Sequence, residues 1–340
     1  MRWHRSRRPP RQRGVALIVA LLVFALAAVL LVGLAREFTL FYQRGANALL
    51  GAQAQAYLLG AEELAELALA RDYALDQERS APRDDLTELW ARESPPYALD
   101  EGGWLTGRLE DLQGRFNLNL LARQQPESEA GDDAFTPAQR FFLRLLLSFQ
   151  DLALGRSEAV AVTEAIGDWL DADAVARFNG AEDDYYLVQR PAYRAANRPM
   201  ASVSELRSVA NVTPALYERL APLVTVWPAV PSSMNIHTMP EALLAAVNID
   251  GSLEPLLPAD AQALAAQRAA VGFADKQAFL EDPLFRGAPM EEVAGLLGES
   301  SNWFLLSARV EIAGREDRLY SVMHREYRRA RSVLRARGSL

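Results

Sequence analysis

The chain of 340 residues contains no cysteine and only three histidines, His4, His237 and His324. The absence of cysteine excludes disulfide bonds, zinc sites built from thiolates and a cysteine nucleophile. The histidines lie far apart, and none of them belongs to an HExxH or HxH motif. A histidine-rich metal site and a Ser/His/Asp hydrolase are therefore disfavoured. A glycine-rich phosphate loop is also missing. Because the chain shows no nucleophile with its base, we expect that it is not an enzyme.

Outside the N-terminus, basic residues are outnumbered by acidic ones. Six of the 36 basic residues are arginines within the first 14 residues, which contain no acidic residue. The remainder therefore carries 30 basic against 44 acidic side chains, a net charge of −14. Binding to a nucleic-acid backbone depends on basic patches and the release of counterions. The acidic body accordingly predicts no nucleic-acid partner.

An apolar run without a charged side chain covers residues 15–35. As a helix it would be about 30 Å long, which is the thickness of the hydrocarbon core of a bilayer. The preceding arginines should remain in the cytoplasm, so the body would lie on the other side of the membrane. The alternative is a cleaved secretory signal peptide. It is disfavoured because the run exceeds the usual apolar region and no A-x-A site follows.

Gln12, Arg13 and Gly14 end the arginine-rich leader directly before this run. The junction resembles the class III signal of type IV pilins and type II secretion pseudopilins. This resemblance implies that a prepilin peptidase cuts between Gly14 and Val15 and methylates the new N-terminus. It also implies that Val19 is position five of the mature chain, where most members carry glutamate. An unpaired carboxylate at membrane depth costs about 2.5–3.5 kcal/mol. Among the pseudopilins, the K-type minor subunit (GspK) is the one that lacks this glutamate.

Four stretches of the body are similar to K-type pseudopilins, namely residues 111–120, 166–187, 193–206 and 214–227. The resemblance implies an α+β, type IV pilin-like fold with a long N-terminal transmembrane helix, an antiparallel sheet and a large inserted α-helical domain. It implies an inner-membrane protein with a periplasmic body at the tip of the type II secretion pseudopilus, where it starts assembly and helps to export folded proteins. The implied partners are the I- and J-type minor pseudopilins, the inner-membrane assembly platform, the prepilin peptidase and the exported proteins.

Seven consecutive parts are expected along the chain. They are a leader peptide (1–14), the transmembrane (15–35) and periplasmic (36–71) parts of the N-terminal helix, the first part of the pseudopilin sheet (72–122), the inserted helical domain (123–230), helical segments with a closing hairpin (231–327) and a basic tail (328–340). The stripe of the helix that packs on the body is predicted from its apolar spacing as Ala48, Ala52, Leu59, Leu64, Leu67 and Ala70. Alternatively, two separate helices are divided at Gly45, Gly51 or Gly60.

Alternation of apolar and polar residues predicts two β-hairpins. The first would pair residues 104–110 with 115–120, and the second would pair 303–312 with 318–325. Thr136 and Pro137 are typical of the start of a helix, here running toward residue 154, and further helices are expected at 240–247, 259–271, 276–280 and 290–297. Residues 77–96 and 124–134 are predicted to be a connection and a mobile loop, and the basic tail to be solvated.

Six carboxylates gather within 17 residues: Asp168, Asp171, Asp173, Glu182, Asp183 and Asp184. Only Arg177 opposes them locally. A Ca²⁺ ion, which takes six to eight oxygen ligands, would balance this charge, although the spacing departs from an EF-hand. The alternatives are a solvated acidic loop and the acid/base pair of a glycosidase beside Trp169, Tyr185 and Tyr186. The resemblance favours calcium, because K-type pseudopilins bind it through an acidic loop of the helical domain.

Residues 201–227 and 235–280 have the rhythm of helix-hairpin-helix modules, and residues 235–240 are similar to the entry of such modules in competence DNA receptors. Phosphate binding by that module needs a Gly-apolar-Gly turn, whereas residues 210–213 read Ala-Asn-Val-Thr. A membrane-anchored DNA receptor is therefore the second hypothesis, together with a minor pilin of a related machine. His237 and His324 are expected to be a turn residue and a strand surface residue.

Overall fold

The computed structural model describes residues 14–78, 82–100, 102–122 and 135–338. Most of the expected leader, the loop at 124–134 and the last two residues lie outside these ranges. The chain divides into two compact units, Met1–Ala56 and Tyr57–Leu340. Each unit is described by itself below.

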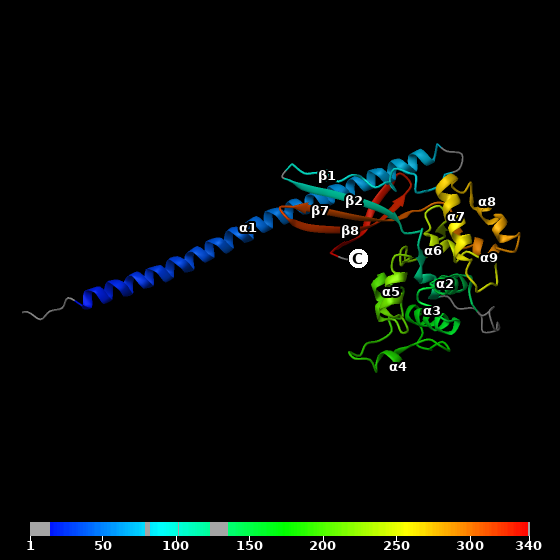
Figure 1. Ribbon diagram of the computed structural model, residues 1–340, viewed down its shortest axis with the longest axis horizontal. Helices are drawn as coiled ribbons and strands as arrows, with labels where there is room; N and C mark the ends of the chain where they lie inside the picture. The colour runs from blue at the N-terminus through cyan, green and yellow to red at the C-terminus, as the bar shows by residue number, and fades with distance from the viewer. Residues whose placement is uncertain (1–13, 79–81, 101, 123–134, 339–340) are drawn as a thin grey trace, which may run out of the picture. The chain divides into compact units, whose positions relative to one another are not determined.

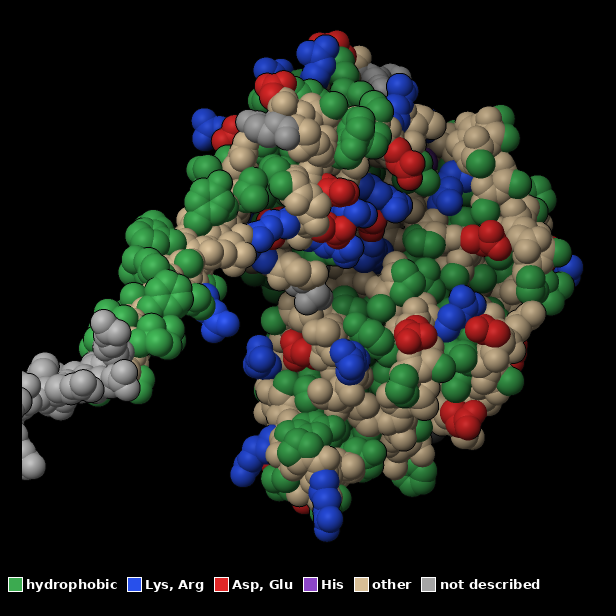
Figure 2. All heavy atoms as spheres, turned by 60° about the vertical axis from the view of Figure 1, so that its left-hand side comes forward, with side chains coloured by type: hydrophobic (Ala, Val, Ile, Leu, Met, Phe, Trp, Pro, Cys, Tyr) green, Lys and Arg blue, Asp and Glu red, His purple; other side chains and the backbone are tan. Residues whose placement is uncertain are grey.

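Helix α1 (Val15–Asp76) is continuous over 62 residues (Figure 1). The expectation of one helix is thus confirmed, and Gly45, Gly51 and Gly60 do not divide it. Within the first unit its leucine and valine side chains point into solvent, and Figure 2 shows this part covered by hydrophobic side chains. By length and composition the helix suffices to cross a membrane, with a mean hydropathy of 3.3 in its most apolar window.

In the second unit, helix α1 buries a stripe formed by Leu58, Ala61, Ala65 and Leu69. The spacing of three and four residues places these side chains on one face of the helix. The predicted stripe was wrong, because Leu64 and Leu67 are 65% and 66% exposed. The hydropathy pattern did not predict the buried face of the helix, because this face contains small alanines and a glutamate. This glutamate, Glu62, is paired with residues of the sheet.

The main sheet has five antiparallel strands in the order β1-β2-β7-β8-β9 (Figure 1). They are β1 (Tyr97–Ala98), β2 (Gly103–Asp111), β7 (Trp303–Ile312), β8 (Arg315–Glu326) and β9 (Arg329–Arg337). The predicted closing hairpin is β7–β8, but its turn is tighter than expected since Ile312 faces Arg315 in the register. Ala313 and Gly314 take the positive φ values of 51° and 72° that such a two-residue turn requires.

The basic C-terminal segment is not a solvated tail. Residues 329–337 form β9, which pairs with β8 from Glu326 opposite Arg329 to Leu319 opposite Arg337. Arg335 binds Glu62 of helix α1 at 2.6 Å, and the backbone of Ser332 donates to Glu66. Composition predicted a tail because arginine-rich segments are usually solvated, whereas carboxylates far away in the sequence attach this one to the body.

The first predicted hairpin does not form. Strand β2 pairs with β7, while β3 (Phe116–Asn117) runs parallel to β4 (Val224–Thr225) and continues into the 3₁₀ helix η1 (Leu118–Ala122). The alternation of residues 115–120 was misread because the asparagines are buried together with the apolar residues. Asn117 donates to the carbonyl of Pro228 at 2.8 Å, and Asn119 to that of Val226 at 3.1 Å.

Short helices and two small strand pairs fill the chain between the first and last parts of the sheet. They are α2 (Pro137–Leu147), α3 (Arg156–Leu170), α4 (Asp183–Tyr186), η3 (Val203–Ser208), α5 (Pro214–Leu220), α6 (Glu241–Leu244), α7 (Pro258–Val271), α8 (Lys276–Leu280), η4 (Pro283–Phe285) and α9 (Glu291–Ala294), with β5 (Met234–Asn235) parallel to β6 (Leu297–Gly298). One hydrophobic core extends through them from Phe116 to Leu297. The expected boundary at residue 230 therefore lies within a single core.

The start of α2 follows from its sequence. The hydroxyl of Thr136 accepts the N–H of Gln139, whose side chain accepts the N–H of Thr136 in return, and Pro137 occupies the first helical position. These contacts satisfy donors that a helix start otherwise leaves free. The helix ends at Leu147 and not near 154.

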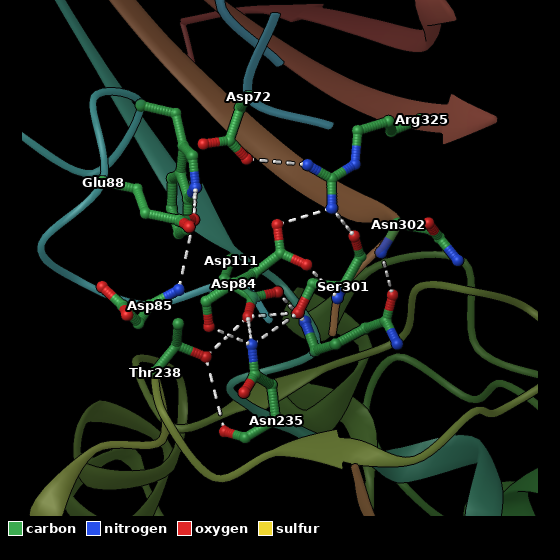
Figure 3. Close-up of polar contacts among 12 residues, drawn as sticks. Asp72, Asp84, Asp85, Glu88, Asp111, Asn235, Thr238, Ser301, Asn302 and Arg325 are labelled. Carbon is green, nitrogen blue, oxygen red and sulfur yellow. Dashed lines mark hydrogen bonds and ion pairs between the residues drawn. The ribbon is translucent and has the colours of Figure 1, made fainter. Parts of the chain in front are cut away.

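Arg325 of β8 is a buried cation that joins three separate segments (Figure 3). Its guanidinium donates to Asp72 of helix α1 at 2.9 Å, to Asp84 at 2.5 Å and to the carbonyl of Ser301 at 2.6 Å. The aromatic ring of Phe304 lies 5.1 Å away on the sheet. Arg325 is only 3% exposed, so these contacts replace its hydration.

Asp111 at the end of β2 joins the sheet to the helical body (Figure 3). One of its carboxylate oxygens accepts from the hydroxyls of Ser301 and Thr238, both at 2.5 Å, and from the amide of Asn235 at 3.2 Å. The same amide donates to the carbonyl of Asp84 at 2.9 Å. Burial raises the pKa of Asp111, and these hydrogen bonds oppose the change.

We expect Arg325→Met to lower the free energy of unfolding by about 3–5 kcal/mol, because it leaves Asp72 and Asp84 buried without this partner. Urea unfolding of the full-length chain in detergent measures the change. Arg331→Met is the matched control. Arg331 is exposed on β9 and has no carboxylate partner among the described residues, so its substitution should cost less than about 0.5 kcal/mol. Equal effects of the two substitutions would contradict the role of Arg325.

Burial raises the pKa of Asp72 to about 7, with further contributions from the carboxylates of Glu88, Asp84 and Asp76, while Arg325 opposes the change. Burial likewise raises the pKa of Asp84 to about 6. At these two carboxyl groups the folded chain therefore binds more protons than the unfolded chain between about pH 4 and pH 7. Their contribution to stability decreases as the pH rises through this window.

The free energy of unfolding should accordingly fall from about pH 4 to about pH 7, by up to about 1.4 kcal/mol per pH unit for each extra proton that these groups hold. Asp72→Asn should flatten this dependence, because the amide does not titrate. Asp100→Asn, at an exposed position, should leave it unchanged. Urea titrations at several pH values give the profile, and a stability that rises toward pH 7 would refute the assignment.

Candidate metal centre

The six predicted carboxylates lie around the loop between α3 and α4. Asp168 is in the last turn of α3, Asp171 caps its C-terminus, and Asp173 follows in the loop. Glu182 occupies the N-cap position of α4 without a side-chain capping hydrogen bond, and two aspartates follow in the first turn. Negative side chains are favourable at that end because the helix dipole is positive there.

Arg177 divides this set. Its guanidinium lies 3.0 Å from a carboxylate oxygen of Asp171 and 3.5 Å from one of Asp168, and its backbone N–H donates to Asp168. Two glycines make room for the pair. A Cβ at Gly180 would lie 1.9 Å from Asp168, and one at Gly167 would lie 1.1 Å from Arg177. Asp168 is fully buried, so this arginine is its countercharge.

Asp171, Asp173 and Glu182 remain close to one another, with one oxygen of each within 4.8 Å of the others. Glu182 is 5% exposed, and neither of its carboxylate oxygens has a hydrogen-bond partner among the described residues. The amide oxygen of Asn197 also lacks one there, while its NH₂ group donates to the carbonyl of Asp173 at 2.8 Å. Asn197 has a positive φ of 46°, and its hydrogen bond to Asp173 holds it beside this group.

Crowding changes the titration of these groups. Burial raises the pKa of Glu182 to about 7, and the charges of Asp168 and Asp171 add to the increase. Burial also raises the pKa of Asp168 to about 6, although hydrogen bonding and attraction to Arg177 oppose the change. Both shifts report negative charge that the surrounding protein does not fully balance.

The other predicted ligands are not part of this group. Asp183 accepts from Arg194 at 3.0 Å and from the backbone of Ala195 at 3.1 Å, and Asp184 is exposed. The geometry thus narrows the six residues to Asp171, Asp173 and Glu182, and adds Asn197, which the sequence did not single out. Carboxylate and amide oxygens are ligands of hard cations such as Ca²⁺, so the residues present fit that ion.

Two of the three aromatic residues near this loop belong to the core, whereas the third, Tyr185, is 44% exposed. Trp169 and Tyr186 are 5% and 0% exposed, with ring centroids 5.2 Å apart. The hydroxyl of Tyr186 accepts the N–H of Ala210 at 3.1 Å. A glycosidase requires such side chains to line an open cleft. The packing of this pair therefore does not favour that alternative.

The turn at residues 210–213 has no glycine, as the sequence indicated. Asn211 takes a positive φ of 65°, and its side chain reaches the carbonyl of Ala161. Thr213 caps α5, which starts at Pro214. These contacts hold the turn against the helical body and explain it as a structural feature.

The predicted processing residues lie at the start of α1. The carbonyl of Gly14 accepts the N–H of Ile18 at 3.2 Å, and the helix begins at Val15. Val19 is 54% exposed on the first turns. His237 occupies a turn, as expected, but it is buried at 2% exposure, and burial lowers its pKa to about 4.

Two family models match the chain, and both are described as type II secretion system (T2SS), protein K. They cover residues 114–229 and 234–296. The type II secretion system protein K of Pseudomonas aeruginosa is 36% identical, over 92% of this chain and 89% of that protein. That of Klebsiella pneumoniae is 34% identical, over 93% and 97%. The chain belongs to the type II secretion system protein K family.

A solved structure supports the same assignment. The crystal structure of the GspK-GspI-GspJ complex from the type 2 secretion system of enterotoxigenic Escherichia coli contains a chain with a TM-score of 0.73 and 27% identity. The match covers 87% of this chain and 100% of that chain. The expected α+β, type IV pilin-like fold is therefore confirmed, and the protein K family identifies the chain as a minor pseudopilin of type II secretion.

Proposed function

We propose that this chain occupies the tip of the type II secretion pseudopilus, bound to the I- and J-type minor pseudopilins. The observation that carries the proposal is the match to an entire chain of the GspK-GspI-GspJ complex. The role is structural and not catalytic. The chain is held in the inner membrane by α1 with its body in the periplasm, starts assembly on the inner-membrane platform and helps to export folded proteins.

Val19 supports a terminal place in the filament. By resemblance, a glutamate at this position neutralises the N-terminal amine of a neighbouring subunit, and valine lacks that charge. A subunit without this pairing fits where no further subunit follows. The helical body between β2 and β7 also makes this subunit bulky, and any subunit stacked beyond it would have to accommodate that bulk. We propose that the prepilin peptidase cuts between Gly14 and Val15, which lie where the helix begins.

The test is to produce the full-length chain with the I- and J-type subunits of its own secretion system and to purify a tagged J-type subunit from detergent extracts. This chain should copurify, and mass spectrometry should find its N-terminus at Val15 with one methyl group. Gold labelling of overproduced pseudopili should place it at one end. Labelling along the length would refute the tip, and an N-terminus beyond Ala35 would refute the anchor.

We further propose that Ca²⁺ binds Asp171, Asp173 and Glu182, with the amide oxygen of Asn197 as an additional ligand. Support comes from the mutual distance of the three carboxylates and from the buried oxygens of Glu182 and Asn197 without a hydrogen-bond partner among the described residues. When bound, the ion supplies positive charge that balances the acidic loop. The chain's own residues orient the ligands, as Asn197 is fixed to Asp173 and Arg177 to Asp171.

Adding Ca²⁺ to the chelator-treated full-length chain should raise its melting temperature. The stabilisation would reach about 2.7 kcal/mol at a concentration one hundred times the dissociation constant. Glu182→Gln should abolish most of this increase, because it removes a ligand charge. Asp184→Asn is the control, since Asp184 lies outside the group, and it should retain the increase. Differential scanning calorimetry measures both, and no increase in the unaltered chain would refute the site.

A further inference from the structure

Strand β9 lies at the edge of the main sheet. It pairs with β8 on one side, with a register shift opposite Val322 and Met323, and no strand of the described residues pairs with its other side. The backbone N–H of Ser332 donates to Glu66 of α1, so the stretch before Ser332 is the part of this edge that we consider. In an antiparallel ladder, alternate residues turn their backbone N–H and C=O groups outward. An open edge of this kind is a template for another extended segment. Charged side chains are one of the means by which an edge avoids unspecific pairing, so the charges of β9 restrict which segment fits.

These charges are all positive. Residues 327–338 contain no acidic side chain. Arg335 is paired with Glu62, whereas Arg328, Arg329, Arg331 and Arg337 are exposed and have no carboxylate partner among the described residues. The chain beyond the leader is otherwise acidic. The edge strand is therefore a basic segment on an acidic body.

A groove of about 960 Å³ runs beside the beginning of β9. Helix α1 contributes Leu67 and Glu63 to its lining, and the turn between β8 and β9 contributes Tyr327. Leu67 and Tyr327 are 66% and 72% exposed, so apolar surface is available there. Carboxylates lie along the α1 side, Glu326 lies at the end of β8, and arginines lie along the β9 side.

We propose that an extended, acidic segment of another protein adds to β9 as a sixth strand of the sheet. Backbone hydrogen bonds to the strand edge would provide affinity, and its carboxylates beside Arg329 and Arg331 would provide specificity. An apolar side chain of the segment fits over Leu67 and Tyr327. A second copy of β9 is disfavoured, because arginines would face arginines across the new pair. This inference goes beyond the proposed function and does not depend on a tip position.

The experiment replaces Tyr327 by the photoreactive residue p-benzoylphenylalanine in the full-length chain, within cells that assemble the secretion system. Tyr97 is the matched control, since it is the same residue type, is 66% exposed and lies on β1 at the opposite edge. Irradiation of the variant substituted at Tyr327 should cross-link a partner protein, and the cross-linked peptide should contain Asp or Glu. The yield of this product should be at least about tenfold that of the variant substituted at Tyr97. Mass spectrometry identifies the peptide.

Charge reversal by Arg329→Glu with Arg331→Glu should lower the yield of this product about tenfold, while Arg329→Lys with Arg331→Lys should retain it. Arg329 and Arg331 are both exposed, so neither double substitution should change the melting temperature of the chain. Arg108→Glu, at an exposed position of β2, should have no effect. A link to lipid, to a second copy of the chain or to a peptide without acidic residues would overturn the proposal. So would a yield equal to that at Tyr97 or insensitive to charge reversal.

Discussion

The body depends on the requirement that the buried charge of Arg325 be compensated. A guanidinium withdrawn from water needs hydrogen bonds and opposite charge at fixed distances. Asp72, Asp84 and the carbonyl of Ser301 provide them. These groups come from the end of α1, from the segment before the sheet and from the segment that leads into β7. The side chain of Arg325 therefore connects these three segments to one another.

The same region shows which parts of the fold follow from the sequence. The long helix, the β7–β8 hairpin and α8 were predicted correctly, because apolar periodicity and turn chemistry act locally. The β2 pairing, the burial of Asp84 within the connection after α1, and β9 were not predicted as such. Each depends on ion pairs or hydrogen bonds across more than 100 residues, such as Arg335 with Glu62 and Asn235 with Asp111. A single sequence contains no signal for such partners.

The carboxylate cluster was predictable as a region, but the sequence did not show which of its members lie close together. Six clustered carboxylates marked the loop, yet Arg177 binds Asp168 and Asp171, and Arg194 binds Asp183. Asn197 could have been suspected only because asparagine tolerates a positive φ. Which carboxylates gather and which of them pair with arginines is a consequence of folding, and Asp171 does both. The pairing required Gly167 and Gly180, whose lack of a side chain leaves space for Arg177 and Asp168.

Arginine has two distinct roles in this acidic chain. Arg144 and Arg325 are buried, and the side chain of Arg177 is 13% exposed. Each bonds to a segment that is distant in the sequence or to a crowded carboxylate. Such residues bond to carbonyls or carboxylates of the body itself and are not available to partners. The arginines of β9 are exposed on an open strand edge, and only Arg335 has a carboxylate partner among the described residues of that strand. Because net charge averages the two roles, it concealed that the acidic body presents a basic edge.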